Sequence, residues 1–298
     1  MAVTDIIMPA QSTNAPIVRS IRLADLKEAL REGWDDFLEM PTHVPFLILI
    51  YPIVGLLLAS ASFDQDMIPL LYPIVSGLAL IGPLSGIFLF ELSRRRELGM
   101  DTSWRHAFDV VHSPSFPSIA AICLLLVAIF GIWIVCAQAI YNTNFGIRRI
   151  TSAYEFARLV LTTPEGFNLI VLGNIVGFLF AIAAATLSVI SLPLLLDRNV
   201  GYSAAILTSL KVVARNPFVM AVWGLIVVLA LLLGALPLFI GLAVVFPVLG
   251  HATWHLYRKV IEPDPTPRPD YQPQQKGPRY AAEFPASMFF RAKDGEKP

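Results

Sequence analysis

Five long stretches without a formal charge constrain the fold of this chain more than any other feature. A bilayer core about 30 Å thick is crossed by about 20 apolar residues of helix, and each of the first four stretches has room for one such helix. The fifth, from Pro217 to Tyr257, is too long for one, and Gly234 and Pro237 favour a tight turn within it. A single long helix or a re-entrant loop is the alternative there. The predicted spans are residues 44–63, 67–91, 116–141, 167–196, 217–234 and 236–257.

The composition agrees with lipid as the solvent for much of the chain. Hydrophobic residues make up 56% of the 298 residues and charged residues 15%, whereas soluble domains carry about 25% charged residues. This balance excludes an ordinary soluble enzyme. A formal net charge of zero also excludes a nucleic-acid-binding module, because no basic field is present to displace counterions from phosphates. Cys123 and Cys136 lie within one apolar run and are predicted to be packing residues.

The basic residues predict the orientation in the membrane. Lysines and arginines precede the first span and follow the second and fourth, whereas the links after the first and fifth spans contain none. By the positive-inside rule, both termini face the cytoplasm. The loop 142–165 is an exception, because it holds Arg148, Arg149 and Arg158 on the opposite side. Its apolar residues predict a helix that lies on the outer surface. These residues are Ile147, Ile150, Tyr154 and Val160.

A weak internal repeat predicts three similar units. One offset superposes Arg96 on Arg198, Gly99 on Gly201, Val110 on Val212, Val111 on Val213 and Phe116 on Phe218. Each copy leaves an even-numbered span, passes a glycine, forms a short amphipathic helix and enters an odd-numbered span. Residues 25–39, which precede the first span, provide a third copy. We therefore predict an all-α bundle of six membrane spans with amphipathic helices on the cytoplasmic side.

The predicted helix 25–39 contains six acidic and two basic residues. Anionic lipid would repel it, so docking on protein is favoured over docking on the membrane surface. The alternative is a solvated acidic face whose apolar stripe covers the bundle. That stripe is predicted to consist of Leu23, Leu26, Leu30, Trp34, Phe37 and Leu38.

The two ends of the chain differ from the membrane domain, which is predicted to span residues 18–260. Residues 1–17 are predicted to be disordered. Residues 261–298 form a proline-rich cytoplasmic tail that cannot bury enough apolar surface to become ordered. An apolar cluster near its end suggests a short docking motif, or a segment that folds back on the bundle or on lipid headgroups. The cluster consists of Phe284, Met288, Phe289 and Phe290.

His251 and His255 are the candidate metal ligands. They lie four residues apart at the inner end of the last span, so both imidazoles share one helical face. The other histidines, His43, His106 and His112, are predicted on the same side of the membrane, where the five could assemble a metal or haem site. Against this, no carboxylate or cysteine completes a ligand set by spacing, and histidines are ordinary at membrane edges. We therefore assign no cofactor.

Polar residues within the spans do not predict an ion pathway. The bilayer-centre positions carry no charge, and Glu91 is predicted to pair with the adjacent residues Arg94–Arg96. Asn174 and Gln138 are predicted to form interhelical hydrogen bonds. These features argue against a proton- or sodium-coupled transporter but leave a passive channel or a lipid-handling protein open. No nucleophile, metal or nucleotide motif of a known enzyme class is present, so we do not expect an enzyme.

Small residues at a spacing of four predict close helix contacts. They are Gly82 and Gly86 in the second span, and Gly173, Gly177, Ala181 and Ala185 in the fourth. Contacts within the bundle are the favoured interpretation, because six spans need internal contacts first. A dimer seam is the alternative.

The run GPLSGIFLFELSRRRELG at residues 82–99 resembles the hallmark of a bacterial family of predicted integral membrane proteins, the domain of unknown function DUF2189. The runs IRLADL at 21–26, GWDDF at 33–37 and YPIVGL at 51–56 are similar to it as well. The resemblance covers about residues 18–260. It implies a bacterial inner-membrane protein with six spans, and it carries no functional residues over.

Three functions remain open on the sequence. The first is a non-catalytic accessory or scaffold subunit of a membrane complex, or of a homo-oligomer, suggested by the acidic helix, the small residues and the tail. The second is a passive transporter or channel for a small solute or lipid, suggested by the repeats and by prolines within the spans. The third is a metal- or haem-handling protein that uses His251 and His255.

Overall fold

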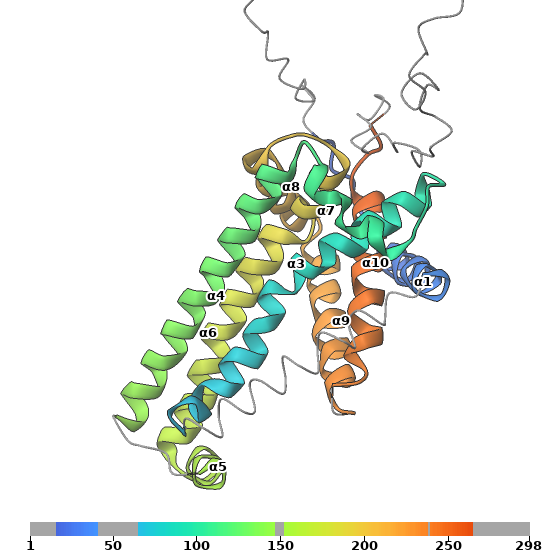
Figure 1. Ribbon diagram of the computed structural model, residues 1–298. Coiled ribbons are helices and arrows are strands. Elements are labelled where there is room, and N and C mark those ends of the chain that lie inside the picture. The colour runs from blue at the N-terminus through green and yellow to red at the C-terminus, as the bar shows by residue number, and fades with distance from the viewer. Residues whose placement is uncertain (1–15, 41–64, 147–151, 238, 265–298) are drawn as a thin grey trace, which may run out of the picture. The chain divides into compact units, whose positions relative to one another are not determined.

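The computed structural model describes residues 16–40, 65–146, 152–237 and 239–264 (Figure 1). The regular elements in these ranges are all helices. They are α1 (Leu23–Glu39), η1 (Gln65–Leu70), α3 (Leu71–Glu97), η2 (Trp104–His112), α4 (Phe116–Phe145), α5 (Ala153–Thr162), α6 (Pro164–Ser188), α7 (Ser191–Asp197), α8 (Tyr202–Arg215), α9 (Pro217–Ala235) and α10 (Leu242–Val260). The described residues belong to one compact unit, residues 1–268. The predicted first span, the residues 1–15 and most of the predicted tail lie outside the described ranges.

Four stretches among the described residues are long and apolar enough to cross a membrane. They are Ile68–Glu97, Phe116–Phe145, Pro164–Asp197 and Pro217–Ala235. These stretches correspond to the predicted second to fifth spans. Large apolar side chains are exposed along α4, α6 and α9, which is the surface expected of helices whose solvent is lipid. The protein is therefore a multi-pass integral membrane protein.

The predicted sixth span corresponds to α10, which is not among the four apolar stretches. Its first half is apolar, but its second half carries two histidines followed by Arg258 and Lys259. These polar residues lower the hydropathy of the helix as a whole. Within this second half, His251, Trp254 and Tyr257 are fully buried.

A turn separates α9 from α10 at the position where Gly234 and Pro237 favour one. The two backbones approach closely there, because a Cβ atom on Gly241 would lie 2.8 Å from the Cα atom of Gly234. The long apolar stretch 217–257 thus contains two helices in the structure rather than one.

The two better-defined copies of the predicted repeat share their local geometry. Gly99 and Gly201, which the repeat superposes, both have a positive φ, of 67° and 78°. This conformation strains any residue with a Cβ atom. Val110 in η2 and Val212 in α8 are also superposed, and both are buried. The short helices that contain them lead directly into the apolar helices α4 and α9.

Helix α3 packs against α4 and α6, and α10 packs against α1, α3 and α9. Figure 1 shows α7 and α8 at one end of the α4–α6 pair and α5 at the other. The predicted helix in the loop 142–165 is present as α5. Leu159 is its buried residue, whereas Tyr154, predicted on the apolar face, is exposed. Ile147 and Ile150 lie outside the described residues.

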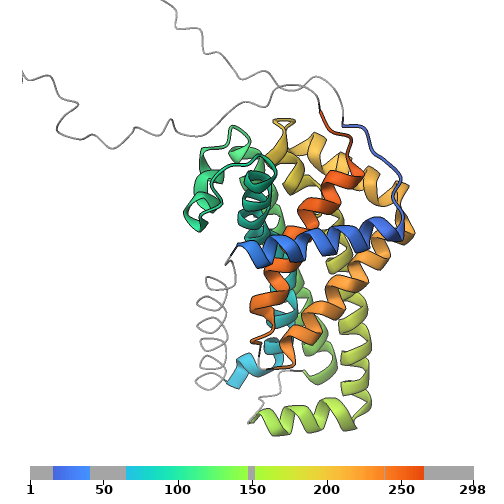
Figure 2. The ribbon, with the colours of Figure 1, turned by 90° about the vertical axis from the view of Figure 1, so that its right-hand side faces the viewer.

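Helix α1 lies across α10 (Figure 2), and Gly33 lies against Ala252 at the crossing. A Cβ atom on Gly33 would lie 2.5 Å from the backbone nitrogen of Ala252. The segment before α1 is held as well, because Val18 pairs with Ile261 in an antiparallel bridge. Asn216 accepts a hydrogen bond from the backbone N–H of Ile21 through its Oδ1 atom, at 2.9 Å.

The buried face of α1 differs from the predicted stripe. It consists of Leu26, Ala29, Gly33 and Asp36. Leu23, Trp34 and Leu38, predicted on the buried stripe, are exposed. The face is displaced because the small residues Ala29 and Gly33 allow the helices to approach closely, and because Asp36 finds polar partners on the neighbouring helices.

Candidate functional site

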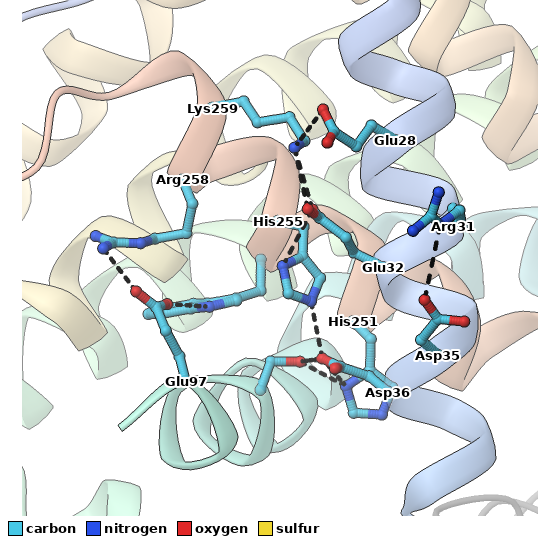
Figure 3. A network of polar contacts seen from close by, with 12 residues as sticks. Glu28, Arg31, Glu32, Asp35, Asp36, Glu97, His251, His255, Arg258 and Lys259 are labelled. Atoms are coloured by element: carbon cyan, nitrogen blue, oxygen red, sulfur yellow. Dashed lines mark hydrogen bonds and ion pairs between the residues drawn. The ribbon is translucent and has the colours of Figure 1, made fainter. Parts of the chain in front are cut away.

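The candidate site is a group of polar side chains where α1, α3 and α10 meet (Figure 3). We call it the Asp36 cluster, and it consists of Asp36, Ser93, Arg96, His251 and His255. Helix α1 supplies the carboxylate, α3 the hydroxyl and guanidinium groups, and α10 the two imidazoles. These residues are far apart in the sequence, and the crossing of α1 over α10 brings them together.

The Asp36 carboxylate is the centre of the cluster. Its side chain is 2% exposed and interacts with groups from two other helices. The Oγ atom of Ser93 donates a hydrogen bond to Oδ2, Arg96 binds Oδ1 through Nη1, and Nε2 of His255 lies 2.9 Å from Oδ2. A buried carboxylate is costly unless its oxygens accept several hydrogen bonds, and this one satisfies that condition.

The same contacts set the charge of the carboxylate. Burial alone would raise the pKa of Asp36, but hydrogen bonds from His255, Ser93 and Arg96 and the charge of His255 outweigh it. The pKa of Asp36 is thereby lowered from 3.8 to about 2. The group is therefore ionised at any physiological pH.

The two predicted metal ligands, His251 and His255, do face the same carboxylate. His251 is fully buried, with Nδ1 at 2.7 Å from the Oγ atom of Ser93 and 3.8 Å from Oδ2 of Asp36. His255 is closer to the surface and also approaches Glu32, with Nδ1 at 3.4 Å from Oε2. The imidazoles thus contact hydrogen-bonding groups of α1 and α3. No group of three or more His, Cys, Asp or Glu residues within the described ranges is arranged to hold a metal ion.

Ion pairs extend the cluster along α1. Lys259 Nζ lies 3.0 Å from Oε2 of Glu28 and 3.2 Å from Oε2 of Glu32. At the other end of the helix, Arg96 also pairs with Glu39. Figure 3 shows the Glu28 and Glu32 side chains pointing from α1 toward α10. Glu28, Glu32 and Glu39 are therefore paired with the protein's own basic residues, while their side chains remain 36–65% exposed.

Further polar contacts fasten the other side of α10. Trp254 donates a hydrogen bond from Nε1 to Glu97 at 3.1 Å, and Arg258 pairs with the same carboxylate at 2.6 Å. The Tyr257 hydroxyl donates to Oδ2 of Asp197, the last residue of α7, at 2.6 Å. The end of α10 is thus bound to α1, α3 and α7 through side chains that it buries.

The other histidines are not part of the Asp36 cluster. His106 interacts with Asp109 at 2.8 Å and with Asp101 at 3.2 Å, and His112 is exposed. His43 lies outside the described residues. The described histidines are therefore divided between two places, and the structure does not bring them together as one metal or haem site.

The polar residues predicted within the spans make local and interhelical contacts. Glu91 pairs with Arg94 at 2.8 Å, as predicted, whereas Arg96 turns to the Asp36 cluster. Asn174 accepts a hydrogen bond from the hydroxyl group of Tyr72 on α3 at 2.8 Å. Gln138 donates to Asn142 on its own helix at 2.8 Å.

The predicted packing glycines have different surroundings. A Cβ atom on Gly177 would lie 3.0 Å from Trp133 of α4, and one on Gly82 would lie 3.5 Å from Phe246 of α10. Gly86 is buried beside Phe90 of its own helix.

The small residues of α6 do not form one continuous contact within the bundle. They are Gly173, Gly177, Ala181 and Ala185. Ala181 packs against the core, but Ala185 is exposed. A Cβ atom on Gly173 would meet nothing within 4 Å. Gly177, in the middle of this row of residues, thus faces α4, whereas Gly173 and Ala185 at the two ends of the row do not.

Sequence reasoning identified the two histidines of α10 but not Asp36, Ser93 or Arg96 as their partners. One signal could have found the cluster. The predicted helix 25–39 is rich in acidic residues, and the end of α10 carries two histidines, Arg258 and Lys259. Complementary charge on two helices that flank the membrane domain favours a contact between them.

Comparison with known proteins identifies a family for the central part of the chain. No curated protein and no solved structure matches the chain. A family model described as a predicted integral membrane protein, DUF2189, matches residues 71–197, from the start of α3 to the end of α7. The match includes the run at 82–99 that carries the resemblance, whereas the runs at 21–26, 33–37 and 51–56 lie outside it. Residues 71–197 of this multi-pass membrane protein are therefore similar to the predicted integral membrane proteins of the DUF2189 family.

Proposed function

We propose that the protein is a non-catalytic accessory or scaffold subunit of a complex in the bacterial inner membrane. In this proposal residues 44–63 and α10 are the first and last of six spans. Both termini are cytoplasmic, and α1, η2 and α8 are amphipathic helices on that side. The positions of Arg94–Arg96, Arg198 and Lys259 near these helices support the orientation.

A polar pair on the exposed surface of the spans is the observation that carries this proposal. The Tyr72 hydroxyl donates to Asn174, and both residues are exposed. Asn174 lies ten residues after the start of α6 at Pro164, or about 15 Å along the helix. Gly173 beside it leaves open space. The Asn174 amide also donates to the carbonyl oxygen of Ile170 at 2.7 Å, so the pair is hydrogen-bonded within the protein. Another membrane helix that packs on this surface would shield the pair from lipid.

Much of the apolar surface of the spans is exposed. Within the most apolar part of each span, 22% is buried for α4 and for α9 and 28% for the α6 span, compared with 43% for the α3 span. Lipid covers such surface without specificity. The polar pair and the adjacent glycine supply the specific contacts that a partner helix needs.

The Asp36 cluster supports a structural role rather than a chemical one. Its carboxylate, guanidinium and imidazole groups interact with one another, and Asp36, Ser93 and His251 are buried. We assign to it the function of fastening α1 to α10. A rigid junction of this kind holds the exposed span surfaces in a fixed arrangement, as a scaffold requires.

A tagged pull-down from the native membrane in mild detergent, followed by mass spectrometry, tests the proposal. We expect a stoichiometric partner, and we expect Asn174→Leu to reduce its recovery. Asn168→Leu is the matched control, since Asn168 is an exposed asparagine on the same helix that hydrogen-bonds Asn144 at 2.7 Å. Recovery of the protein alone, or equal loss in both variants, would contradict the proposal and favour the passive transporter.

The tail is tested in the same assay. Removing the residues after Glu262 deletes the predicted docking motif with Phe284 and Met288, which lies outside the described residues. We expect the truncated protein to retain less partner than the full chain. Unchanged co-purification would remove the tail from the proposal while leaving the span surface as the docking site.

A further inference from the structure

Helix α8 presents an apolar stripe and two cations on its exposed side. Leu207, Leu210 and Ala214 are exposed and recur at helical spacing, so they share one face. The opposite face of α8 is buried, through Ala205, Thr208, Ser209 and Val212. The stripe ends where α9 begins, and Phe218 in the first turn of α9 is 68% exposed. The exposed face of α8 therefore adjoins the lipid-facing surface of a membrane-crossing helix.

Lys211 and Arg215 lie along one edge of this stripe. They also line an open groove of about 480 Å³ between α8 and the segment before α1. The groove is formed by Pro16, Ile17, Val18, Lys211, Ala214 and Arg215. It thus has two cations on one wall and apolar side chains beside them, and Ala214 belongs to both the groove and the stripe.

The charges around the groove leave it positive. Arg215 donates a hydrogen bond from Nε to the Oγ atom of Ser20 at 3.1 Å, which holds the guanidinium at the edge of the groove. The nearby carboxylate of Glu262 pairs with Arg19 at 3.8 Å. The three positive charges of Lys211, Arg215 and Arg19 outnumber the one negative charge of Glu262. The groove therefore favours an anion.

The position of the cations fits the depth of lipid headgroups. Arg215 is two residues before Pro217, the first residue of the apolar helix α9. A residue so close to the start of a membrane-crossing helix lies near the membrane–water interface, whichever side of the membrane that is. Phosphates of the lipid headgroups lie at the same depth, and long basic side chains reach them there.

The repeat provides an internal comparison. Leu210 superposes on Phe108 of η2, and both are exposed. The positions of Lys211 and Arg215, however, superpose on Asp109 and Ser113. The apolar surface is thus common to α8 and η2, whereas η2 lacks the pair of cations.

We propose that α8 and the segment before α1 form a binding site for an anionic phospholipid. Lys211 and Arg215 bind the headgroup phosphate, and an acyl chain lies along Leu207 and Leu210 toward Phe218. Phosphate chemistry alone would also suit free inorganic phosphate. The apolar stripe that continues from the cations onto α9 favours the lipid.

Native mass spectrometry of the full chain in mild detergent tests this site, with dioleoyl phosphatidylglycerol and dioleoyl phosphatidylcholine as probes. We expect the wild-type protein to retain phosphatidylglycerol in preference to phosphatidylcholine. Each basic residue at a membrane surface strengthens binding to anionic lipid. Removing two of them in Lys211→Gln/Arg215→Gln should therefore weaken phosphatidylglycerol binding roughly 10- to 30-fold. Binding of phosphatidylcholine should change little, because its headgroup has no net charge.

The matched control is Lys27→Gln/Arg31→Gln. Lys27 and Arg31 have the same spacing on the exposed face of α1, and removing them changes the net charge by the same amount. We expect this variant to bind phosphatidylglycerol like the wild type. Equal weakening in both double variants, or no preference for phosphatidylglycerol in the wild type, would overturn the proposal. Full displacement of phosphatidylglycerol by millimolar inorganic phosphate would assign the site to a free anion and also overturn it.

Discussion

Replacing Asp36 with asparagine should destabilise the protein through the loss of one buried charge. The substitution keeps the size of the side chain, but it removes the negative charge that Arg96 and His255 contact. It also places an amide N–H₂ among groups that donate hydrogen bonds. We expect α1 to loosen from α10 as a result.

The magnitude follows from the pKa of the carboxyl group. The pKa of Asp36 is lowered from 3.8 to about 2, which corresponds to about 2–3 kcal/mol of stability at neutral pH. For a protein of this size, such a loss lowers Tm by roughly 3–5 °C. Because the folded-state pKa is lowered, this stability is fully present above pH 3.8 and is lost as the pH falls toward 2.

Thermal unfolding in detergent, followed by tryptophan fluorescence, measures the effect, since the buried Trp254 reports on the end of α10. Asp35→Asn is the control, because Asp35 is half-exposed and its ion pair with Arg31 is long, at 3.9 Å. We expect this variant to unfold within about 1 °C of the wild type, since exposed ion pairs contribute little. The reasoning is refuted if Asp36→Asn costs no more than Asp35→Asn, or if the cost stays constant as the pH is lowered from 5 to 2.

Three further substitutions or treatments test the structure. Gly33→Ala should destabilise the protein by about 1–3 kcal/mol, because the added methyl group would collide with the backbone of Ala252, and Gly173→Ala, where space is open, should be neutral in the same unfolding assay. Tyr257→Phe should cost about 1–3 kcal/mol by removing the hydrogen bond to the buried carboxylate of Asp197. Purified protein should retain less than about a tenth of an equivalent of metal after chelation and dialysis, and its Tm should be unchanged, because both imidazoles of α10 are engaged in hydrogen bonds.

The sequence predicted the helices well in the segments that are surrounded mainly by lipid. Uncharged stretches of the length of a bilayer gave the second to fifth spans, and Gly234 and Pro237 marked the turn between α9 and α10. The helix α1 was also predicted, from Asp25 to Glu39, against an observed Leu23–Glu39. These features depend on local composition and on periodicity, which a single sequence contains.

The contacts of α1 could not be predicted from the same information. Periodicity weights large apolar residues, so it placed Trp34 and Leu38 on the buried face. The structure instead buries Gly33 and Asp36, because a close helix crossing needs small residues and because the carboxylate has partners on α3 and α10. Those partners depend on the tertiary fold, and a pattern within fifteen residues cannot reveal them.

The contact between α1 and α10 has a consequence for the biosynthesis of the protein. Asp36 and His255 are 219 residues apart. At a translation rate of about 5–20 residues per second, α1 is complete for roughly 10–40 s before its partner helix has been made. During that time its acidic residues have no basic partners on α10, and its small-residue face is uncovered. Docking of α1 onto α10 can therefore occur only after α10 has been synthesised.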